Sequence, residues 1–160
     1  MSSSENISAT ATAIDISEPA LAIAKQNSAE HGVCARLALI KANVLVDDIS
    51  EYVRSADVIV SNPPYINSDV IDTLSAEVLN EPRIALDGGD DGMIFYRHFI
   101  NSLAPLMKPS AVMILEIGYD QSERISALCD DAGLSCTLHR DFGGNIRVAI
   151  IKCDKPGKNE

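Results

Sequence analysis

The feature that most constrains this chain is a double proline directly after a short apolar run. Residues 57–61 read Asp-Val-Ile-Val-Ser, which is typical of a buried strand, and the next four residues are Asn62-Pro63-Pro64-Tyr65. Proline supplies no backbone N–H, and Pro64 favours an extended conformation at Pro63. Ligands of open α/β sheets bind beyond the carboxyl ends of the strands. We therefore expect a stiff loop with a ligand site at this end of the strand.

The side chains of this loop suit a flat amide or amino group. The amide of Asn62 can both accept and donate hydrogen bonds, and carbonyls in a proline-rich turn are left free to accept. Tyr65 adds an aromatic ring. The sequence therefore predicts a site that holds an –NH2 group.

Composition and charge disfavour several classes of protein. The 160 residues are enough for one domain with a single core, and the net charge is −10, without a cluster of Lys or Arg. Such a chain repels free nucleic acid, so we expect no direct nucleic-acid binding. No stretch is long and apolar enough to span a membrane, and nothing resembles a secretory signal.

The cysteines and histidines show no metal-ligand spacing. The chain has four cysteines without a C-x-x-C pair, and three histidines that lie far apart in the sequence. We interpret the cysteines as small apolar residues in a reducing compartment, and we expect a cytoplasmic protein without a bound metal.

Strands and helices alternate along the chain, which predicts an α/β fold with helices on both faces of a mostly parallel sheet. A helix that begins at the cap Ser17 should run to about His31, with Gly32 as its stop. The expected strands cover residues 11–16, 36–41, 57–61 and 111–117, and the chain closes with an antiparallel hairpin of residues 134–140 and 146–152. Further helices are expected at residues 48–54, 69–79, 93–107 and 121–132.

Asp15 ends the first of these strands and directly precedes a helix. A carboxylate in this position can accept hydrogen bonds from a ribose diol. It can equally be an acid that is favoured at a helix amino terminus. The residue alone leaves both interpretations open.

Several segments together resemble one enzyme family. Asn62-Pro63-Pro64-Tyr65 resembles the signature of methyltransferases that use S-adenosylmethionine on planar amide or exocyclic amino nitrogens. Further segments are similar to blocks of the HemK/PrmC family, the release factor glutamine methyltransferases, and the resemblance covers roughly residues 11 to 152. These segments are residues 15–21, Glu81-Pro82 with residues 85–89, Asp91-Gly92 with Phe95-Tyr96, Leu115-Glu116-Ile117-Gly118 and residues 141–147.

The resemblance implies a Rossmann-like class I S-adenosylmethionine-dependent methyltransferase fold. It also implies methylation of the glutamine in the Gly-Gly-Gln loop of peptide chain release factors, with the release factor as the protein partner in translation termination. Asn62 and the Pro63 carbonyl would each accept one amide hydrogen, and Tyr65 would stack on the amide. Pro64 would complete the substrate-binding loop. The catalytic residues implied are thus Asn62, Pro63 and Tyr65.

The resemblance also implies contacts to S-adenosyl-L-methionine from Asn62 and from residues nearer the amino terminus. These are Asp15 and Ile16 after one strand, and Asn43 and Val44 after the next, where Asn43 stands in place of the family's acid. Glu116 is expected to be a structural acid rather than a base. Arg147 is expected to pair with an internal carboxylate, and Gly88-Gly89 to shape the pocket wall.

The sequence departs from the family before residue 11. The family's first strand with its glycine-rich turn, and its helical amino-terminal domain, have no counterpart in the printed sequence. We therefore expect residues 1–10 to be irregular, residues 11–153 to form a partial catalytic domain, and residues 154–160 to be a disordered tail. The missing strand should leave two sheet edges unpaired. Earlier residues could fill the gap, the two halves could close up, or another copy of the chain could lend a strand in a homo-oligomer.

The sequence leaves other functions open. The chain could be a truncated, catalytically silent domain that acts only in binding or assembly, because the glycine-rich turn is missing. It could be an adenine-N6 nucleic-acid methyltransferase, since the same tetrapeptide serves there, although the chain has no basic face. Methylation of a ribosomal-protein glutamine is a close variant of the leading hypothesis.

Overall fold

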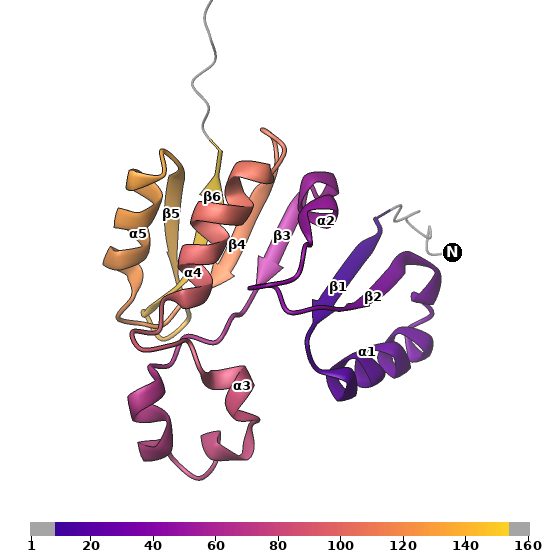
Figure 1. The fold of residues 1–160 in the computed structure, drawn as a ribbon, viewed down its shortest axis with the longest axis horizontal. Coiled ribbons are helices and arrows are strands. Elements are labelled where there is room, and N and C mark those ends of the chain that lie inside the picture. Colours follow the sequence, from indigo (N-terminus) through magenta and orange to yellow (C-terminus); the bar gives the residue numbers. More distant parts are fainter. Residues whose placement is uncertain (1–8, 154–160) are drawn as a thin grey trace, which may run out of the picture. The chain divides into compact units, whose positions relative to one another are not determined.

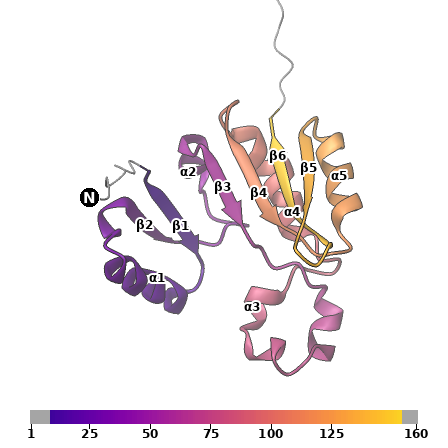
Figure 2. The same cartoon turned by 180° about the vertical axis from the view of Figure 1, so that it is seen from behind.

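The computed structural model describes residues 9–153, which form parts of two compact units, Met1–Tyr52 and Val53–Glu160. Most of the predicted irregular segment 1–10, and the whole of the predicted tail 154–160, lie outside the described residues. Figure 1 shows the elements of each unit, and Figure 2 shows them from behind.

The first unit contains a parallel strand pair and one long helix. Strand β1 (Ala11–Asp15) pairs with β2 (Leu37–Lys41) in a register that sets Ala11 opposite Leu37, and helix α1 (Glu18–Glu30) connects them through a short 3-10 turn (Cys34–Arg36). The predicted start and end of the helix are confirmed. The Ser17 side chain accepts a hydrogen bond from the backbone N–H of Ala20 at 3.3 Å, and Gly32 ends the helix with φ +66°.

The second unit is built on a four-stranded sheet in the order β3-β4-β6-β5. Strands β3 (Val58–Ser61) and β4 (Val112–Glu116) are parallel, whereas β6 (Ile146–Lys152) is antiparallel to both β4 and β5 (Ser135–Arg140). The predicted closing hairpin is thus confirmed. The sequence boundary between the two units falls within helix α2 (Ser50–Ser55), and α5 (Ser122–Asp131) packs against the hairpin strands.

Strand β3 has no buried residue, which corrects the expectation of a buried strand. Within the described residues β3 hydrogen-bonds to β4 alone, and β1 to β2 alone, so two edges are open as the missing strand predicted. Val58 and Val60 are 55% and 72% exposed. An apolar run marks a strand that can be covered on both faces, but it does not supply the neighbours that cover it.

The predicted helix at residues 69–79 is wrong. The chain forms two separate 3-10 turns there, Ser68–Thr73 and Val78–Asn80, followed by a short helix α3 (Arg83–Leu86). Ile71 is the one buried residue of the two turns, so no apolar stripe exists to hold a longer helix against the core. The Ser68 hydroxyl bonds to Asp87 at 2.6 Å instead of capping a helix.

The predicted helix at residues 93–107 forms, but its pitch changes twice. Helix α4 (Ile94–His98) continues as a π-helical segment (Phe99–Leu103) and then as a 3-10 turn (Ala104–Leu106). Figures 1 and 2 show α4 across one face of the four-stranded sheet. Its buried side chains meet those of β4 in the core, which includes Tyr96, Ile100, Met113, Leu115, Ile125 and Ile151, each at 0% exposure.

Within residues 9–153, the helices are all too short or too polar to cross a membrane. The cysteines are free thiols, of which Cys129 is buried and Cys34 is exposed.

Candidate functional site

The double-proline loop leaves the carboxyl end of β3 and is held by a second loop rich in glycine. We call residues 62–68 the site loop and residues 87–92 the glycine loop. The N–H of Ile66 donates to the carbonyl of Leu86 at 3.0 Å, the N–H of Gly88 to Ile66 at 2.8 Å, and the N–H of Ser68 to Gly89 at 3.0 Å. These backbone bonds form a short strand-like contact between the two loops.

The acceptors expected in the site loop are free of internal partners. Asn62 is exposed, Pro63 is buried, and Pro64 and Tyr65 are half-buried. Among the described residues, neither the Asn62 side chain nor the Pro63 carbonyl takes part in a hydrogen bond. The Asn62 side chain is thus both exposed and unpaired, whereas Pro63 is unpaired but buried.

Two glycines of the glycine loop let its backbone pack directly against Tyr65. A Cβ on Gly88 would lie 2.8 Å from the Cα of Tyr65 and 2.9 Å from the Cα of Gly92. A Cβ on Gly92 would collide with the Tyr65 carbonyl oxygen, and Gly92 also has φ +70°. Gly88 is thus required for space rather than for an unusual backbone conformation. The sequence predicts that Gly88-Gly89 shapes this wall, and it marks Gly92 only as part of a family-like segment.

Arg147 lies beside the ring of Tyr65. Its Cζ is 5.8 Å from the ring centroid, and its Nη2 is 3.5 Å from the Tyr65 hydroxyl. The guanidinium also donates to the Ile117 carbonyl at 3.3 Å and lies 4.0 Å from the Glu116 carboxylate. The expected pairing of Arg147 with a carboxylate is present, at the longest distance that counts as an ion pair. The contact with Tyr65 was not expected, because it joins residues that are far apart in the sequence.

Gln121 is the buried polar residue at the centre of this region. Its Nε2 donates to the carbonyls of Tyr65 and Gly92, both at 3.0 Å, and its Oε1 accepts from the N–H of Gly118 at 2.9 Å. The sequence marked Gln121 only as the start of a helix. Its position after Leu115-Glu116-Ile117-Gly118 was the sole available signal.

Asp87 orders the first half of the glycine loop. Its Oδ1 accepts from the Ser68 hydroxyl at 2.6 Å and from the N–H of Gly89 at 3.0 Å. The hydrogen bond from Ser68 lowers the pKa of the Asp87 carboxyl, and the bond from Gly89 lowers it further. Asp87 is therefore a structural carboxylate that joins the two loops.

Asp91 orders the second half of the glycine loop. Arg97 donates to both of its carboxylate oxygens at 2.8 and 2.9 Å, and Arg124 donates to the same carboxylate and to the Asp91 carbonyl. The hydrogen bonds from Arg97 hold the pKa of Asp91 well below its usual range. The loop that supports Tyr65 is thus fixed from α4 and from α5.

The other expected ligand-binding residues belong to the first unit. Asp15 ends β1, and its Oδ1 accepts from the N–H of Ser17 at 2.7 Å. Asn43 follows β2, and its Oδ1 accepts from the N–H of Leu45 at 3.0 Å. Because β1 and β2 are parallel, Asp15 and Asn43 lie at the same edge of this strand pair, with exposed Ile16 and half-buried Val44 beside them.

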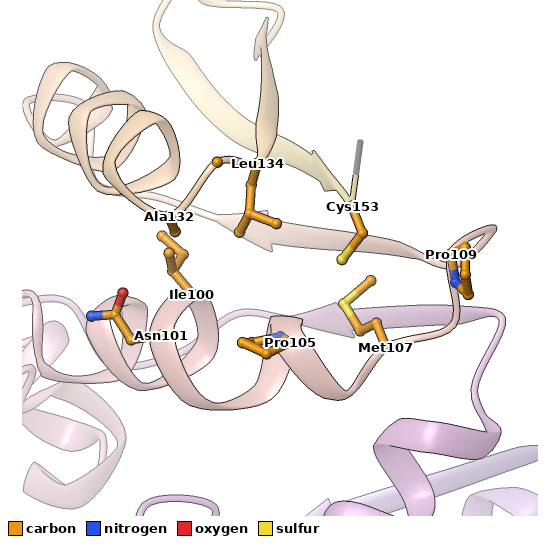
Figure 3. Close-up of a pocket in the computed structure, with 9 residues that line it drawn as sticks. Ile100, Asn101, Pro105, Met107, Pro109, Ala132, Leu134 and Cys153 are labelled. Atoms are coloured by element: carbon orange, nitrogen blue, oxygen red, sulfur yellow. The ribbon is translucent and has the colours of Figure 1, made fainter. Parts of the chain in front are cut away.

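A cavity of about 420 Å³ lies at the other end of the four-stranded sheet. Figure 3 shows Ile100, Met107, Leu134 and Cys153 among the residues that line it. Its walls are mostly apolar, and Met107 and Pro109 precede β4 whereas the site loop follows β3. In the described part of the chain, no three His, Cys, Asp or Glu residues gather as a metal site.

Comparison with known proteins shows the family to which the chain belongs. The family model for the methyltransferase small domain matches residues 1–108. The chain is 43% identical over 139 residues to the release factor glutamine methyltransferase of Caulobacter vibrioides, covering 86% of this chain and 47% of that protein. It is 33% identical over 135 residues to the ribosomal protein uL3 glutamine methyltransferase of Francisella tularensis, covering 84% of this chain and 42% of that protein.

Among solved structures, a methyltransferase from Pyrococcus furiosus superposes with a TM-score of 0.59 at 18% identity, over 89% of this chain and 61% of that chain. At that level of identity the likeness concerns the fold, which is the class I methyltransferase fold expected from the sequence. The chain spans about half the length of the curated relatives it matches.

Proposed function

Because the chain belongs to the methyltransferase small-domain family, we propose that its protein methylates the side-chain amide nitrogen of a protein glutamine. The proposed methyl donor is S-adenosyl-L-methionine, and the proposed substrate is the Gly-Gly-Gln loop of a peptide chain release factor in the cytoplasm. Relatives that are named release factor glutamine methyltransferases support this assignment. We take residues 11–153 as a partial catalytic domain.

The observation that carries the proposal is the pair of free acceptors beside an aromatic ring. The Asn62 side-chain oxygen accepts one hydrogen of the substrate amide, and the Pro63 carbonyl accepts the other. The face of Tyr65 stacks on the plane of the amide. Two acceptors and one ring fix a carboxamide in both position and rotation, and this is the requirement for the reaction.

The chemistry is mainly positioning. When bound, the cofactor supplies a methyl group on a sulfonium, which leaves as a thioether as the new N–C bond forms. An amide nitrogen is a weak nucleophile, because its lone pair is delocalised into the carbonyl. Asn62 and Pro63 would hold the amide so that this nitrogen faces the bound methyl donor, and such positioning contributes about 7–11 kcal/mol in favourable cases. The nitrogen then loses a proton to solvent, so the site needs no strong base.

The chemistry of the first unit suits parts of the cofactor. The exposed Asp15 carboxylate has one oxygen engaged by Ser17, and the other is proposed to accept from the ribose diol. Asn43, with Ile16 and Val44, is proposed to contact the adenine. These assignments follow from the resemblance to the family. They concern residues at or just after the carboxyl ends of β1 and β2.

The test uses the protein together with any sequence that flanks these residues in its gene. Incubation with release factor and labelled cofactor, followed by mass spectrometry, is expected to place one methyl group on the Gly-Gly-Gln glutamine. Asn62→Ala should lower kcat by about 100-fold or more, because the amide loses one of its two anchors. Asn80→Ala, which changes an asparagine outside both loops, is the matched control.

Label on another protein overturns the substrate assignment. A ribosomal-protein glutamine would place the chain with the uL3 enzymes. Methylation of DNA that weakens steeply with salt would instead support a nucleic-acid enzyme. If these 160 residues alone bind S-adenosylmethionine with micromolar affinity in calorimetry, the alternative of a silent binding or assembly domain is excluded. An absence of methylation and binding in the whole protein would favour that alternative.

A further inference from the structure

The side chain of Gln121 makes hydrogen bonds that hold the site loop in place. The residue is 4% exposed and precedes α5, and its side chain points inward instead of capping that helix. An amide side chain has two N–H donors and one carbonyl acceptor. In Gln121 both donors and the acceptor are used, by the three backbone groups described above. A buried amide with both donors paired and its oxygen engaged favours one arrangement of its surroundings.

The three partners belong to three segments that are far apart in the sequence. Gly118 follows β4, Tyr65 belongs to the site loop, and Gly92 ends the glycine loop. The Tyr65 carbonyl is the backbone group of the residue whose ring is proposed to stack on the substrate. A single side chain therefore connects the end of a rigid central strand with the backbone of that ring.

The space around Gln121 is matched to its amide. A Cβ on Gly118 would lie 2.8 Å from the Oε1 of Gln121, and a Cβ on Gly92 would lie 2.8 Å from its Nε2. Both neighbours must therefore be glycine for the amide to fit. Two glycines and a glutamine from different segments thus form one packing unit against Tyr65.

We infer that Gln121 is a positioning residue for the proposed methyl transfer, which holds the Tyr65 backbone so that the ring and the Asn62–Pro63 acceptors face the substrate together. This inference rests on the proposed function. Without the Gln121 donors, the buried carbonyls of Tyr65 and Gly92 lose their partners, and the site loop relaxes to regain them. A displacement of about 1 Å in such a site can cost about 100-fold in rate.

The test compares Gln121→Met with Gln121→Glu and with a matched control. Methionine keeps the length of the side chain but removes all three hydrogen bonds. Glutamate keeps the acceptor for Gly118 but sets a carboxylate against two carbonyls. Tyr96→Phe is the control, because it removes the hydrogen bond from the Tyr96 hydroxyl to the Glu116 carbonyl at 2.9 Å and keeps the Gln121 side chain with its three hydrogen bonds.

The first measurement is hydrogen exchange at the amides of Ile66, Ser68 and Gly88, which join the site loop to the glycine loop. Both Gln121 variants are expected to speed exchange there by about tenfold or more relative to Tyr96→Phe, after correction for global stability. Exchange that equals that of the control at these three amides overturns the inference.

The second measurement is methyl transfer by the whole protein. Gln121→Met should lower kcat by about 10- to 100-fold, with the dissociation constant for S-adenosylmethionine unchanged within about twofold. A kcat equal to that of Tyr96→Phe overturns the inference. If the native protein methylates no glutamine, the proposed function fails, and the exchange measurement alone decides whether Gln121 fixes the site loop.

Discussion

The two units of the chain differ in what stabilises their elements. In the first unit β1, α1 and β2 form where local signals predict them, yet Ser28 and Ile49 are its only buried residues among those described. In the second unit alternate residues of β4 are buried completely, and helices cover them. Caps, prolines and glycines therefore determine where an element begins and ends, whereas stability depends on how much apolar surface it buries.

The largest effect is expected from shortening a leucine in each sheet. Leu115 in β4 is 0% exposed, and Leu39 in β2 is half-buried. Leu115→Ala should lower the free energy of unfolding by about 2–5 kcal/mol, because it leaves a cavity in a packed core. Leu39→Ala should cost less than half as much. Urea denaturation followed by circular dichroism gives both values, and equal losses would contradict the difference in burial between the two leucines.

The next largest effect is expected from replacing glycines. It separates the strain of a positive φ from the collision of a new Cβ with its neighbours. Gly32 and Gly92 have similar φ, +66° and +70°, but a Cβ on Gly32 meets nothing within 4 Å. Gly32→Ala should therefore cost only the strain of a left-handed residue, about 1–2 kcal/mol. Gly92→Ala carries the same strain and in addition displaces the Tyr65 carbonyl, so it should cost more.

The measurement is again the free energy of unfolding, with methyl transfer as a second readout for the whole protein. Gly92→Ala should lower kcat, whereas Gly32→Ala should leave it unchanged. Equal losses of stability in the two variants would contradict the close packing of the glycine loop on Tyr65.

Elements whose determining signal is local form where the sequence predicts them. Ser17 and Gly32 delimit α1, and the glycine turn at residues 143–145 joins β5 to β6, as expected. The site loop is likewise local, since two prolines prevent its own residues from continuing a strand.

Elements and contacts that depend on distant residues differ from the expectation. The segment 69–79 has helix-forming residues, but the core offers its side chains little to pack against. Strand β3 has the apolar sequence of a buried strand, yet none of its residues is buried. Gln121 and Arg147 reach Tyr65 across 56 and 82 residues, a distance at which a single sequence contains no periodic signal.

The smallest expected effect is electrostatic and concerns stability in acid. It compares one carboxylate from each unit. The pKa of Asp91 is lowered chiefly by the hydrogen bonds from Arg97, and the pKa of Glu18 by its hydrogen bond from Lys41. A carboxyl whose pKa is lower in the folded state stabilises the fold above its unfolded pKa of about 4. This contribution is lost as the pH falls towards the folded pKa. Stability should therefore decline below about pH 4.

Asp91→Asn should make that acid decline shallower, by on the order of 1 kcal/mol once solvent screening of this half-exposed group is included. Glu18→Gln should leave the decline unchanged, because Glu18 is fully exposed and its pair with Lys41 is screened by water. Urea denaturation between about pH 6 and pH 2.5 gives both curves. A decline that flattens only with Glu18→Gln would mean that the exposed pair of the first unit, and not the Asp91 pairs that fix the glycine loop, determines acid stability.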